Sequence, residues 1–411
     1  MQVSKYFPHL LDASLRAIKS RGKVRLILGA RQTGKSCLLQ NLEKSPAVSI
    51  DLQDVRLRQA YERAPGALSG ELEARRERRL MVLIDEIQKV PSLLEEIQFL
   101  QDKNPGRFEF FLTGSSARRL RRGAANLLPG RAHALRLTPV ILPERSGWKG
   151  STLLPSMHAP DPRRGFPWLE IEDLLLWGSL PGIAAEPLSR RAATLETYTQ
   201  VYLEEEIRSE AVVRDLGSFS RFLELAALES GQVMNLTKLS QESGIPLATV
   251  RTFYQVLEDT FVGYWIPTYG QASRKKVLST ARFVWFDTGV RNAAARLPLE
   301  RGLLKTAAGP LFEQWVLAEL VHRVSYLGRS CRVSFWRTRH GVEVDAIVET
   351  PKRDIPVEVK WTSNPQATDA RHLEFFLDTF PKRAREGFVI CRVPHARKLT
   401  DRVTALPWSL M

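Results

Sequence analysis

Cysteine is scarce in this sequence of 411 residues. Its three cysteines, Cys37, Cys331 and Cys391, lie far apart and show none of the spacings of zinc ligands. Their scarcity argues against a disulfide framework and a zinc site, and it favours a reducing cytoplasm as the location.

Long apolar runs are also missing. No apolar stretch approaches the roughly 20 residues that a membrane-spanning helix needs, and the first residues lack the apolar core of a secretory signal peptide. We therefore expect no membrane partner. With 44% hydrophobic and 26% charged residues the composition is that of a folded chain, and its length predicts two to four domains.

Negative charge is in short supply. The 60 Lys and Arg residues outnumber the 45 Asp and Glu residues, which gives a net charge of +15 and suggests a polyanionic partner. Residues 1–145 contain 26 basic and 15 acidic residues, whereas residues 146–305 contain 18 of each. The excess therefore lies mainly in the first part of the chain. A basic surface that serves only solubility is the alternative interpretation.

A phosphate-binding motif organises this first part. Apolar residues 24–28 predict a short buried strand, Gly29 begins a turn, and a helix follows it. The spacing G-x-x-x-x-G-K-S is that of a P-loop, whose glycines let backbone amides turn toward phosphate oxygens. Lys35 would reach the β- and γ-phosphates, and the Ser36 hydroxyl would ligate Mg²⁺. ATP and Mg²⁺ are the predicted cofactors.

A second apolar run, residues 80–84, ends in Asp85 and Glu86. At the end of a buried strand Asp85 would hold the Mg²⁺ shell, and Glu86 would polarise the attacking water as a general base. Polar residues also end the next predicted strand, where Ser115 or Thr113 would sense the γ-phosphate. Capping of the following helix is the alternative role of Ser115.

Arg131 precedes another apolar strand and would act as an arginine finger on the site of a neighbouring subunit, which is worth about 10³–10⁵ in rate where it operates. The arginines nearby compete for that role. The predicted catalytic residues are thus Glu86, Arg131 and Lys35. The predicted nucleotide-binding residues are Gly29, Ala30, Arg31, Gln32, Thr33, Gly34, Lys35, Ser36, Cys37, Asp85 and Ser115.

These motifs, Gly-Ala-Arg-Gln-Thr-Gly-Lys-Ser, Leu-Ile-Asp-Glu-Ile-Gln, Leu-Thr-Gly-Ser-Ser and Pro-Gly-Arg, resemble a widespread prokaryotic AAA-type ATPase family. The C-terminal half of that family was long catalogued as a domain of unknown function. The likeness continues at residues 177–182, 202–207 and 286–290 and into the C-terminal part. It implies an ATPase core, a winged-helix unit and a restriction-endonuclease-like unit. The chain departs from the family at Trp177-Gly-Ser, where Gly-Gly is more frequent.

Residues 236–257 predict a helix-turn-helix, because a short helix stops at Gly244 and a second helix follows the turn. Two apolar strands, residues 261–266 and 282–286, would pair as a wing. Exposed residues of the second helix and of the wing tip would contact DNA. They are Thr249, Arg251, Thr252, Arg274, Lys275 and Lys276. A packing or oligomerisation module is the alternative, which the neutral charge of this part favours.

The C-terminal part contains a spacing typical of a nuclease. Twelve residues separate Asp345 from Glu358, Lys360 follows on the same strand face, and Glu313 lies upstream on a helix. This D-x12-E-x-K pattern resembles the PD-(D/E)xK nucleases. Asp345 and Glu358 would ligate Mg²⁺, Lys360 would orient or activate water, and Glu313 would complete the shell. The alternatives are a solvated salt bridge, or a domain that binds DNA without cutting it.

The sequence therefore predicts an α/β fold, in which a P-loop AAA+ ATPase domain is followed by helical and winged-helix units and a restriction-endonuclease-like domain. The expected parts are residues 1–145, the ATPase domain; 146–214, a connector and helical unit; 215–305, the winged helix-turn-helix; and 306–411, the nuclease-like domain.

The leading functional hypothesis is an ATP-hydrolysing motor, a homo-oligomeric and hexameric ring that translocates or remodels duplex or branched DNA and is stimulated by it. One alternative is an ATP-controlled, Mg²⁺-dependent DNA nuclease in defence or repair. The other is a nucleotide switch that assembles with protein partners. An intact Glu86 counts against the switch, because a switch hydrolyses slowly.

Overall fold

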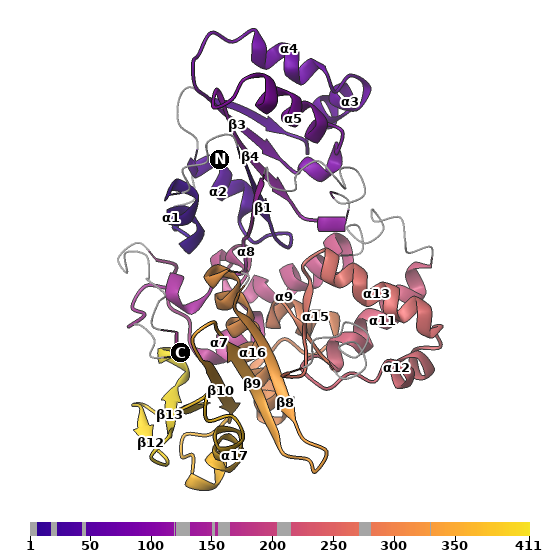
Figure 1. Cartoon of the computed structure of the whole chain (residues 1–411). Helices are drawn as coiled ribbons and strands as arrows, with labels where there is room; N and C mark the ends of the chain where they lie inside the picture. The colour runs from indigo at the N-terminus through magenta and orange to yellow at the C-terminus, as the bar shows by residue number, and fades with distance from the viewer. Residues whose placement is uncertain are drawn as a thin grey trace. The chain divides into compact units, whose positions relative to one another are not determined.

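The computed structural model describes residues 6–17, 23–42, 47–118, 120, 132–149, 153–154, 165–203, 215–270, 281–328 and 330–411. The chain divides into two compact units (Figure 1). Unit 1 is Met1–Thr138 with Asp259–Phe261, and unit 2 is Pro139–Glu258 with Val262–Met411. The division into four parts stays a prediction.

A five-stranded parallel sheet forms the centre of unit 1, in the order β2-β3-β4-β1-β5. The strands are β1 (Val24–Leu28), β2 (Ala47–Asp51), β3 (Leu80–Asp85), β4 (Phe108–Gly114) and β5 (Ala132–Arg136). The helices are α1 (Leu10–Ala17), α2 (Lys35–Leu42), α3 (Val55–Arg63), α4 (Ala67–Glu73), α5 (Leu93–Lys103) and the short η1 (Ile87–Lys89). The predicted parallel α/β sheet is confirmed.

Burial explains the strand order. The mainly apolar strands β3 and β4 are buried along almost their whole length, as inner strands covered on both faces should be. The less apolar β2 and β5 lie at the two edges and are mostly half-buried or exposed. Residues Leu93, Leu94, Ile97 and Leu100 of α5 recur at helical spacing and complete the core. The inner strands β1, β3 and β4 therefore end together at one edge of the sheet.

Unit 2 begins with a mainly helical part. Its helices are η2 (Leu142–Glu144), α7 (Ile171–Trp177), α8 (Pro181–Ala185), α9 (Leu188–Thr197), η3 (Tyr198–Leu203), α11 (Leu216–Leu228), α12 (Leu236–Ser243), α13 (Leu247–Asp259) and α15 (Thr288–Ala294). The strands β6 (Gly263–Ile266) and β7 (Arg282–Trp285) pair antiparallel, with Gly263 opposite Trp285.

Two motifs of the family resemblance meet in this part. The Asp287 carboxylate caps α15 by accepting the Val290 N–H at 3.0 Å, and it also accepts the Ser179 N–H at 2.6 Å. Gly178 has a φ of +73°, and a Cβ on it would lie 2.1 Å from Asp287 Oδ1. The chain departs from the family's Gly-Gly at Trp177, but it keeps Gly178, and the turn at this place needs that glycine.

The helix-turn-helix elements form where they were expected. Asn235 caps α12 by accepting the Lys238 N–H at 3.0 Å, and α12 ends at Gly244, whose φ is +68°. Helix α13 follows after Ile245 and Pro246. The assignment of these elements and the β6–β7 pair as a winged helix stays a prediction, and the basic residues of the wing tip lie outside the described residues.

A six-stranded mixed sheet forms the C-terminal part of unit 2, in the order β12-β13-β11-β10-β9-β8. The strands are β8 (Arg332–Arg337), β9 (Glu343–Glu349), β10 (Asp354–Val359), β11 (Gly387–Cys391), β12 (Arg397–Lys398) and β13 (Val403–Pro407). The helices are η4 (Arg301–Leu303), α16 (Leu304–Leu327), η5 (Ala367–Ala370), α17 (Arg371–Thr379) and η6 (Trp408–Leu410).

The segment after β6 joins this sheet to the helical part. The Tyr269 N–H donates to the Phe335 carbonyl at 2.7 Å, and the Phe335 N–H donates to the Pro267 carbonyl at 3.0 Å. The Tyr269 hydroxyl donates to Asp354 at 2.7 Å. Backbone and side-chain hydrogen bonds thus connect the β6–β7 pair to β8. Within the described ranges, no helix is both long and apolar enough to cross a membrane.

Candidate functional site

The predicted P-loop lies between β1 and α2, at the carboxyl edge of the unit 1 sheet. Gly29 begins it because a Cβ there would lie 2.3 Å from the Leu137 carbonyl oxygen. Gln32 has a φ of +61° and Gly34 a φ of +94°, so the loop turns twice through the left-handed region. The Lys35 ammonium is buried and donates to the carbonyls of Gly29 at 3.0 Å and Ala30 at 2.8 Å. These bonds hold the lysine across the loop.

Asp85 connects the P-loop helix to the two strands beside it. Its carboxylate accepts the Ser36 hydroxyl at 2.6 Å and also the Thr113 hydroxyl. The Glu86 N–H donates to the Thr113 hydroxyl at 3.0 Å. The two residues predicted to hold Mg²⁺, Ser36 and Asp85, are therefore adjacent and offer only oxygen atoms, which is the donor set that Mg²⁺ prefers. The residues present fit the ion.

Glu86 lies in a strained turn beside these groups. Its backbone has a φ of +59° and a ψ of +45°, a left-handed conformation that few glutamates adopt, and its side chain is 8% exposed. The Glu86 carboxylate accepts the Ser115 hydroxyl at 3.1 Å and the Gln88 amide N–H. Gln88 also donates to Ser115 at 2.8 Å. The turn and these bonds aim the carboxylate toward the end of β4.

Gln88 is a residue that the sequence analysis missed. It follows Glu86 by two positions, and only the left-handed turn brings its amide back to the carboxylate. We expect Gln88→Ala to lower kcat for ATP hydrolysis about fivefold with little change in KM, because one orienting hydrogen bond is worth roughly 1 kcal/mol. Steady-state phosphate release checks this, with Gln98→Ala on α5 as the control. An unchanged kcat would show that Gln88 does not position Glu86.

Not every predicted residue of this site can be placed. Arg131 lies outside the described residues, as do Arg119, Arg121 and Arg122, so the arginine-finger prediction is neither supported nor opposed. Cys37 has an exposed thiol on α2, and only its backbone is suited to phosphate contact. The roles of these arginines and of Cys37 stay predictions. The other predicted residues of the site lie close together in the structure, and their roles are predictions as well.

Four exposed arginines lie at the other end of the same sheet, near the point where strand β3 begins. They follow α4 and precede β3: Arg75, Arg76, Arg78 and Arg79. Within the described part of the chain none of them forms an ion pair. Arg107 holds the backbone of this turn by donating to the Glu77 carbonyl at 3.2 Å and to the Arg75 carbonyl. The turn is thus an ordered basic surface, which we name the arginine turn.

The four residues of the predicted nuclease site gather in unit 2. Lys360 Nζ lies 2.8 Å from Glu358 Oε1, and the Val359 N–H donates to Asp345 Oδ2 at 2.8 Å. Glu313 reaches the same place from α16. Burial, and then the charge of Asp345, raises the pKa of Glu313 to about 7 and that of Glu358 to about 8. Burial also raises the pKa of Asp345.

A buried arginine that the sequence analysis missed lies among these carboxylates. Arg282 Nη1 is 2.7 Å from Glu313 Oε1, and Arg282 Nη2 bonds to Glu343 and lies 3.9 Å from Asp345 Oδ1. Burial alone would lower the pKa of Arg282, but the three carboxylates raise it overall. In the described ranges, no three Asp, Glu, His or Cys side chains are arranged to hold a metal ion. The cluster as it stands therefore does not fit the predicted Mg²⁺.

The raised pKa of Glu358 has a consequence for stability. Between its ordinary value of 4.5 and about 8, the folded state binds more protons at this group than the unfolded state. The contribution of Glu358 to the free energy of unfolding is therefore present at low pH and is lost as pH rises through this window. We expect Glu358→Gln to gain stability relative to the parent chain between about pH 5 and pH 8.5. Urea unfolding at both pH values measures this; a constant difference would contradict it.

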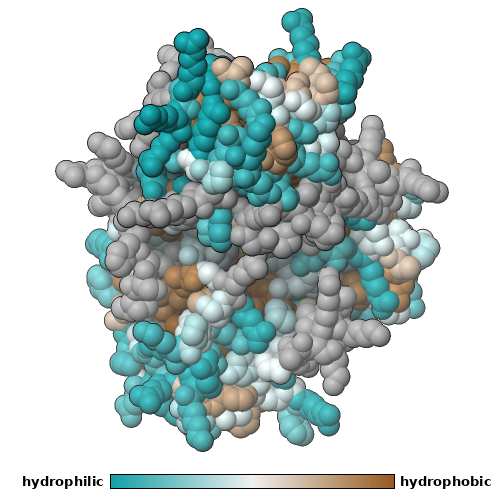
Figure 2. All heavy atoms as spheres, turned by 45° about the horizontal axis from the view of Figure 1, so that its top comes forward, coloured by the Kyte–Doolittle hydropathy of each residue, from teal (hydrophilic) through white to brown (hydrophobic). Residues whose placement is uncertain are grey.

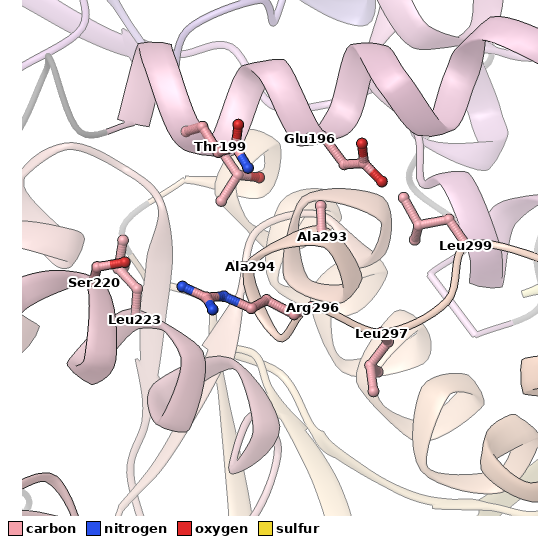
Figure 3. Close-up of a pocket in the computed structure, with 10 residues that line it drawn as sticks. Glu196, Thr199, Ser220, Leu223, Ala293, Ala294, Arg296, Leu297 and Leu299 are labelled. Atoms are coloured by element: carbon pink, nitrogen blue, oxygen red, sulfur yellow. The ribbon is translucent and has the colours of Figure 1, made fainter.

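One further cavity lies in unit 2, with a volume of about 390 Å³. Figure 3 shows Glu196 and Thr199 on one side of it and Ala293 and Ala294 facing them. Arg296 also lines it, with its Nε 3.2 Å from Glu224 Oε2. None of the predicted site residues lines this cavity, and no sequence motif pointed to it.

Family models match three parts of the chain. Residues 21–145 match a model described as an AAA domain. Residues 169–301 and 308–411 match two models described as domains of unknown function, DUF8612 and DUF4143. The first part of the chain is therefore an AAA-type P-loop ATPase domain, which confirms that part of the prediction. The descriptions of the other two give no fold or chemistry, so the winged-helix and endonuclease-like assignments stay predictions.

Similar proteins add little about function. Uncharacterized proteins of Mycobacterium bovis and Mycobacterium tuberculosis are each 25% identical over 408 residues, which cover 96% of this chain and 82% of theirs. A Walker-type ATPase of Pyrococcus abyssi has a TM-score of 0.47 at 15% identity and covers 70% of this chain and 96% of its own. A DNA polymerase III gamma subunit-related protein of Thermotoga maritima has a TM-score of 0.25 at 13% identity, over 62% of this chain and 99% of its own. At these TM-scores neither structure supports an assignment.

Proposed function

We propose that this chain is an ATPase that couples hydrolysis in unit 1 to movement on or remodelling of DNA. The observation that carries the hydrolytic part is the convergence of Lys35, Ser36, Asp85 and Glu86 at one edge of the sheet. Lys35 and Ser36 begin α2 after β1, and Asp85 and Glu86 lie at the end of β3, which is where a parallel sheet binds its ligand. An AAA-type domain over the same residues supports this.

The chain's own groups divide the work of hydrolysis. The P-loop amides and Lys35 bind the phosphates, and Lys35 gives up its loop carbonyls to do so. Ser36 and Asp85 would hold Mg²⁺, which would supply positive charge to neutralise the phosphates. Glu86 accepts a proton from the attacking water. Ser115 and Gln88 both donate to Oε2 of this carboxylate, which fixes its position and leaves Oε1 to accept the proton.

The DNA part of the proposal is supported by charge. The arginine turn offers four positive side chains at the edge of the sheet away from the nucleotide, so a polyanion bound there does not compete with ATP. Hydrophilic side chains cover much of the face of unit 1 that Figure 2 shows. DNA affinity that rests on such contacts falls with salt, with a slope of about 0.9 for each phosphate contact on duplex DNA.

A panel of ATPase assays tests the whole proposal. ATP turnover is measured without nucleic acid and with single-stranded, duplex and branched DNA, with Glu86→Gln as the inactive control. A second variant replaces all four arginines of the arginine turn with alanine. We expect DNA to stimulate the parent chain, and the fourfold variant to keep basal turnover but lose stimulation and part of the salt slope. Absence of both DNA stimulation and salt-sensitive binding would end the DNA proposal and leave the ATPase.

Assembly is part of the same proposal. The predicted hexameric ring, with Arg131 acting on a neighbouring site, rests on the sequence alone. Light scattering with and without ATP, and turnover in mixtures of Arg131→Ala and Glu86→Gln chains, tests it. Recovery of activity in the mixture, where each chain alone is inactive, is the expected result for a finger that acts between subunits.

The Mg²⁺-dependent nuclease is the second candidate. The gathering of Asp345, Glu358 and Lys360 favours it, and Arg282 among them opposes it. It predicts DNA cleavage that disappears in Asp345→Ala and in Lys360→Ala. Cleavage that persists in both variants would remove the assignment.

A further inference from the structure

Arg282 brings a positive charge from the β6–β7 pair into a cluster of carboxylates on other elements. It is the first residue of β7 and is 4% exposed. Its guanidinium bonds to Glu313 of α16 and Glu343 of β9, and the Phe335 ring of β8 lies 4.9 Å from the guanidinium carbon. A charge this deeply buried persists only where opposite charges are held around it. These acids are its counter-charges.

The far side of the cluster is occupied as well. Lys360 pairs with Glu358, and Asp345 accepts the Val359 N–H. A divalent cation bound by Asp345 and Glu358 would lie near the guanidinium of Arg282, whose Nη2 is 3.9 Å from Asp345. Like charges this close together repel each other at the effective dielectric constant of a protein surface, and the repulsion is twice as large for a divalent ion. Arg282 and a divalent cation therefore compete for the same acids.

We propose that Arg282 is the built-in cation of this cluster, and that it excludes Mg²⁺ or Mn²⁺ as long as the β6–β7 pair is docked on the C-terminal sheet. The acids bind a divalent cation when the guanidinium leaves. This inference rests on the second candidate function for the identity of the metal-binding acids, and it is independent of ATP hydrolysis.

The backbone of Arg282 ties its guanidinium to the position of the strand pair. Arg282 lies opposite Ile266 in β6 and forms a further bridge with Val233, and the Met234 N–H donates to the Ala281 carbonyl at 2.9 Å. Because the backbone of Arg282 is held by these pairings, we expect withdrawal of its guanidinium from the acids to require movement of the strand pair. The affinity of the carboxylate cluster for a divalent cation should therefore rise when the β6–β7 pair moves away from the C-terminal sheet.

Calorimetric titration of the full chain with Mn²⁺, without nucleotide, tests the proposal. We expect weak binding to the parent chain and at least tenfold tighter binding to Arg282→Met, which keeps most of the buried volume. Arg337→Met is the matched control, because Arg337 pairs with the same Glu343 at 3.4 Å but is half exposed; it should behave like the parent. Adding Asp345→Asn to Arg282→Met should abolish the gain.

A second variant guards against misfolding, since Arg282→Met leaves several carboxylates without their cation. Arg282→Met with Glu313→Gln removes one of those charges and keeps Asp345 and Glu358. Its melting temperature should rise with Mn²⁺, whereas that of the parent chain should not.

Two results would overturn the proposal, and they differ in whether the nuclease candidate survives. Tight binding to the parent chain that is lost in Asp345→Asn and unchanged in Arg282→Met would show an open metal site, which leaves the nuclease candidate standing. No binding to any variant would remove the nuclease candidate too. ATP turnover, measured on the same preparations, reports separately on the ATPase.

Discussion

Replacing Glu86 with glutamine should lower kcat for ATP hydrolysis about 10²–10⁴-fold while ATP affinity changes by no more than about twofold. Glutamine has the same shape and can keep the left-handed turn at this position, but it cannot accept a proton from water. Binding of a fluorescent ATP analogue and phosphate release by the same preparation separate the two effects. A parallel fall in binding would mean that the variant has disturbed the loop rather than the chemistry.

Glu95→Gln is the matched control, since Glu95 is an exposed acid in the first turn of α5 and forms no hydrogen bond or ion pair with a predicted site residue within the described ranges. It should retain the turnover of the parent chain. If Glu86→Gln hydrolyses ATP within a few-fold of the parent, Glu86 is not the general base and another group activates the water. Thr113 would be the next position to change, because its hydroxyl contacts both Asp85 and the Glu86 backbone.

Lys35→Ala should weaken ATP binding about 10²-fold or more and abolish measurable turnover. Each hydrogen bond between an ammonium and a phosphate oxygen is worth about 1.5–3 kcal/mol, and the buried Lys35 is placed to make at least two. The loss should be smaller for ADP than for ATP, because ADP has no γ-phosphate to contact. Equilibrium titration with both nucleotides measures the difference.

The Lys35 variant needs a check on folding, because its ammonium also bonds the carbonyls of Gly29 and Ala30. Urea unfolding without nucleotide should show a loss of about 1–2 kcal/mol, the cost of two carbonyls that must find water. Lys103→Ala, which removes an exposed lysine paired with Glu73 at 2.8 Å, should leave both binding and turnover unchanged. Full ATP affinity in Lys35→Ala would contradict the P-loop assignment itself.

Local pattern was enough to predict that the candidate nucleotide-binding residues of unit 1 lie together. The P-loop and the acids after β3 each follow an apolar run, and parallel strands bring such run ends to one edge. What could not be predicted is the orientation of Glu86, since its partner Gln88 is set by a backbone conformation that sequence does not indicate for glutamate. The periodicity of apolar residues predicts a strand, but it does not predict that a single residue such as Glu86 adopts the left-handed backbone conformation.

In the C-terminal cluster the sequence predicted some of the residues but not the one that matters most for metal binding. Spacing alone selected Asp345, Glu358 and Lys360, and the structure brings them together. Arg282 is 31 residues before Glu313 and 61 before Glu343, on a strand whose sequence reads as ordinary and apolar. No local pattern marks an arginine that is buried by partners so distant, so the feature that decides whether these acids accept a metal was invisible in the sequence.

The contact between Gly29 and Leu137 links the nucleotide to the path of the chain. The Leu137 carbonyl leaves no room for even one added carbon at Gly29, and the Leu137 N–H donates to the Leu28 carbonyl at 2.7 Å. The first segment of unit 1 ends one residue later, at Thr138. If phosphates shift the predicted P-loop at Gly29, we therefore expect the backbone at Leu137 to move with it, because the two are in contact.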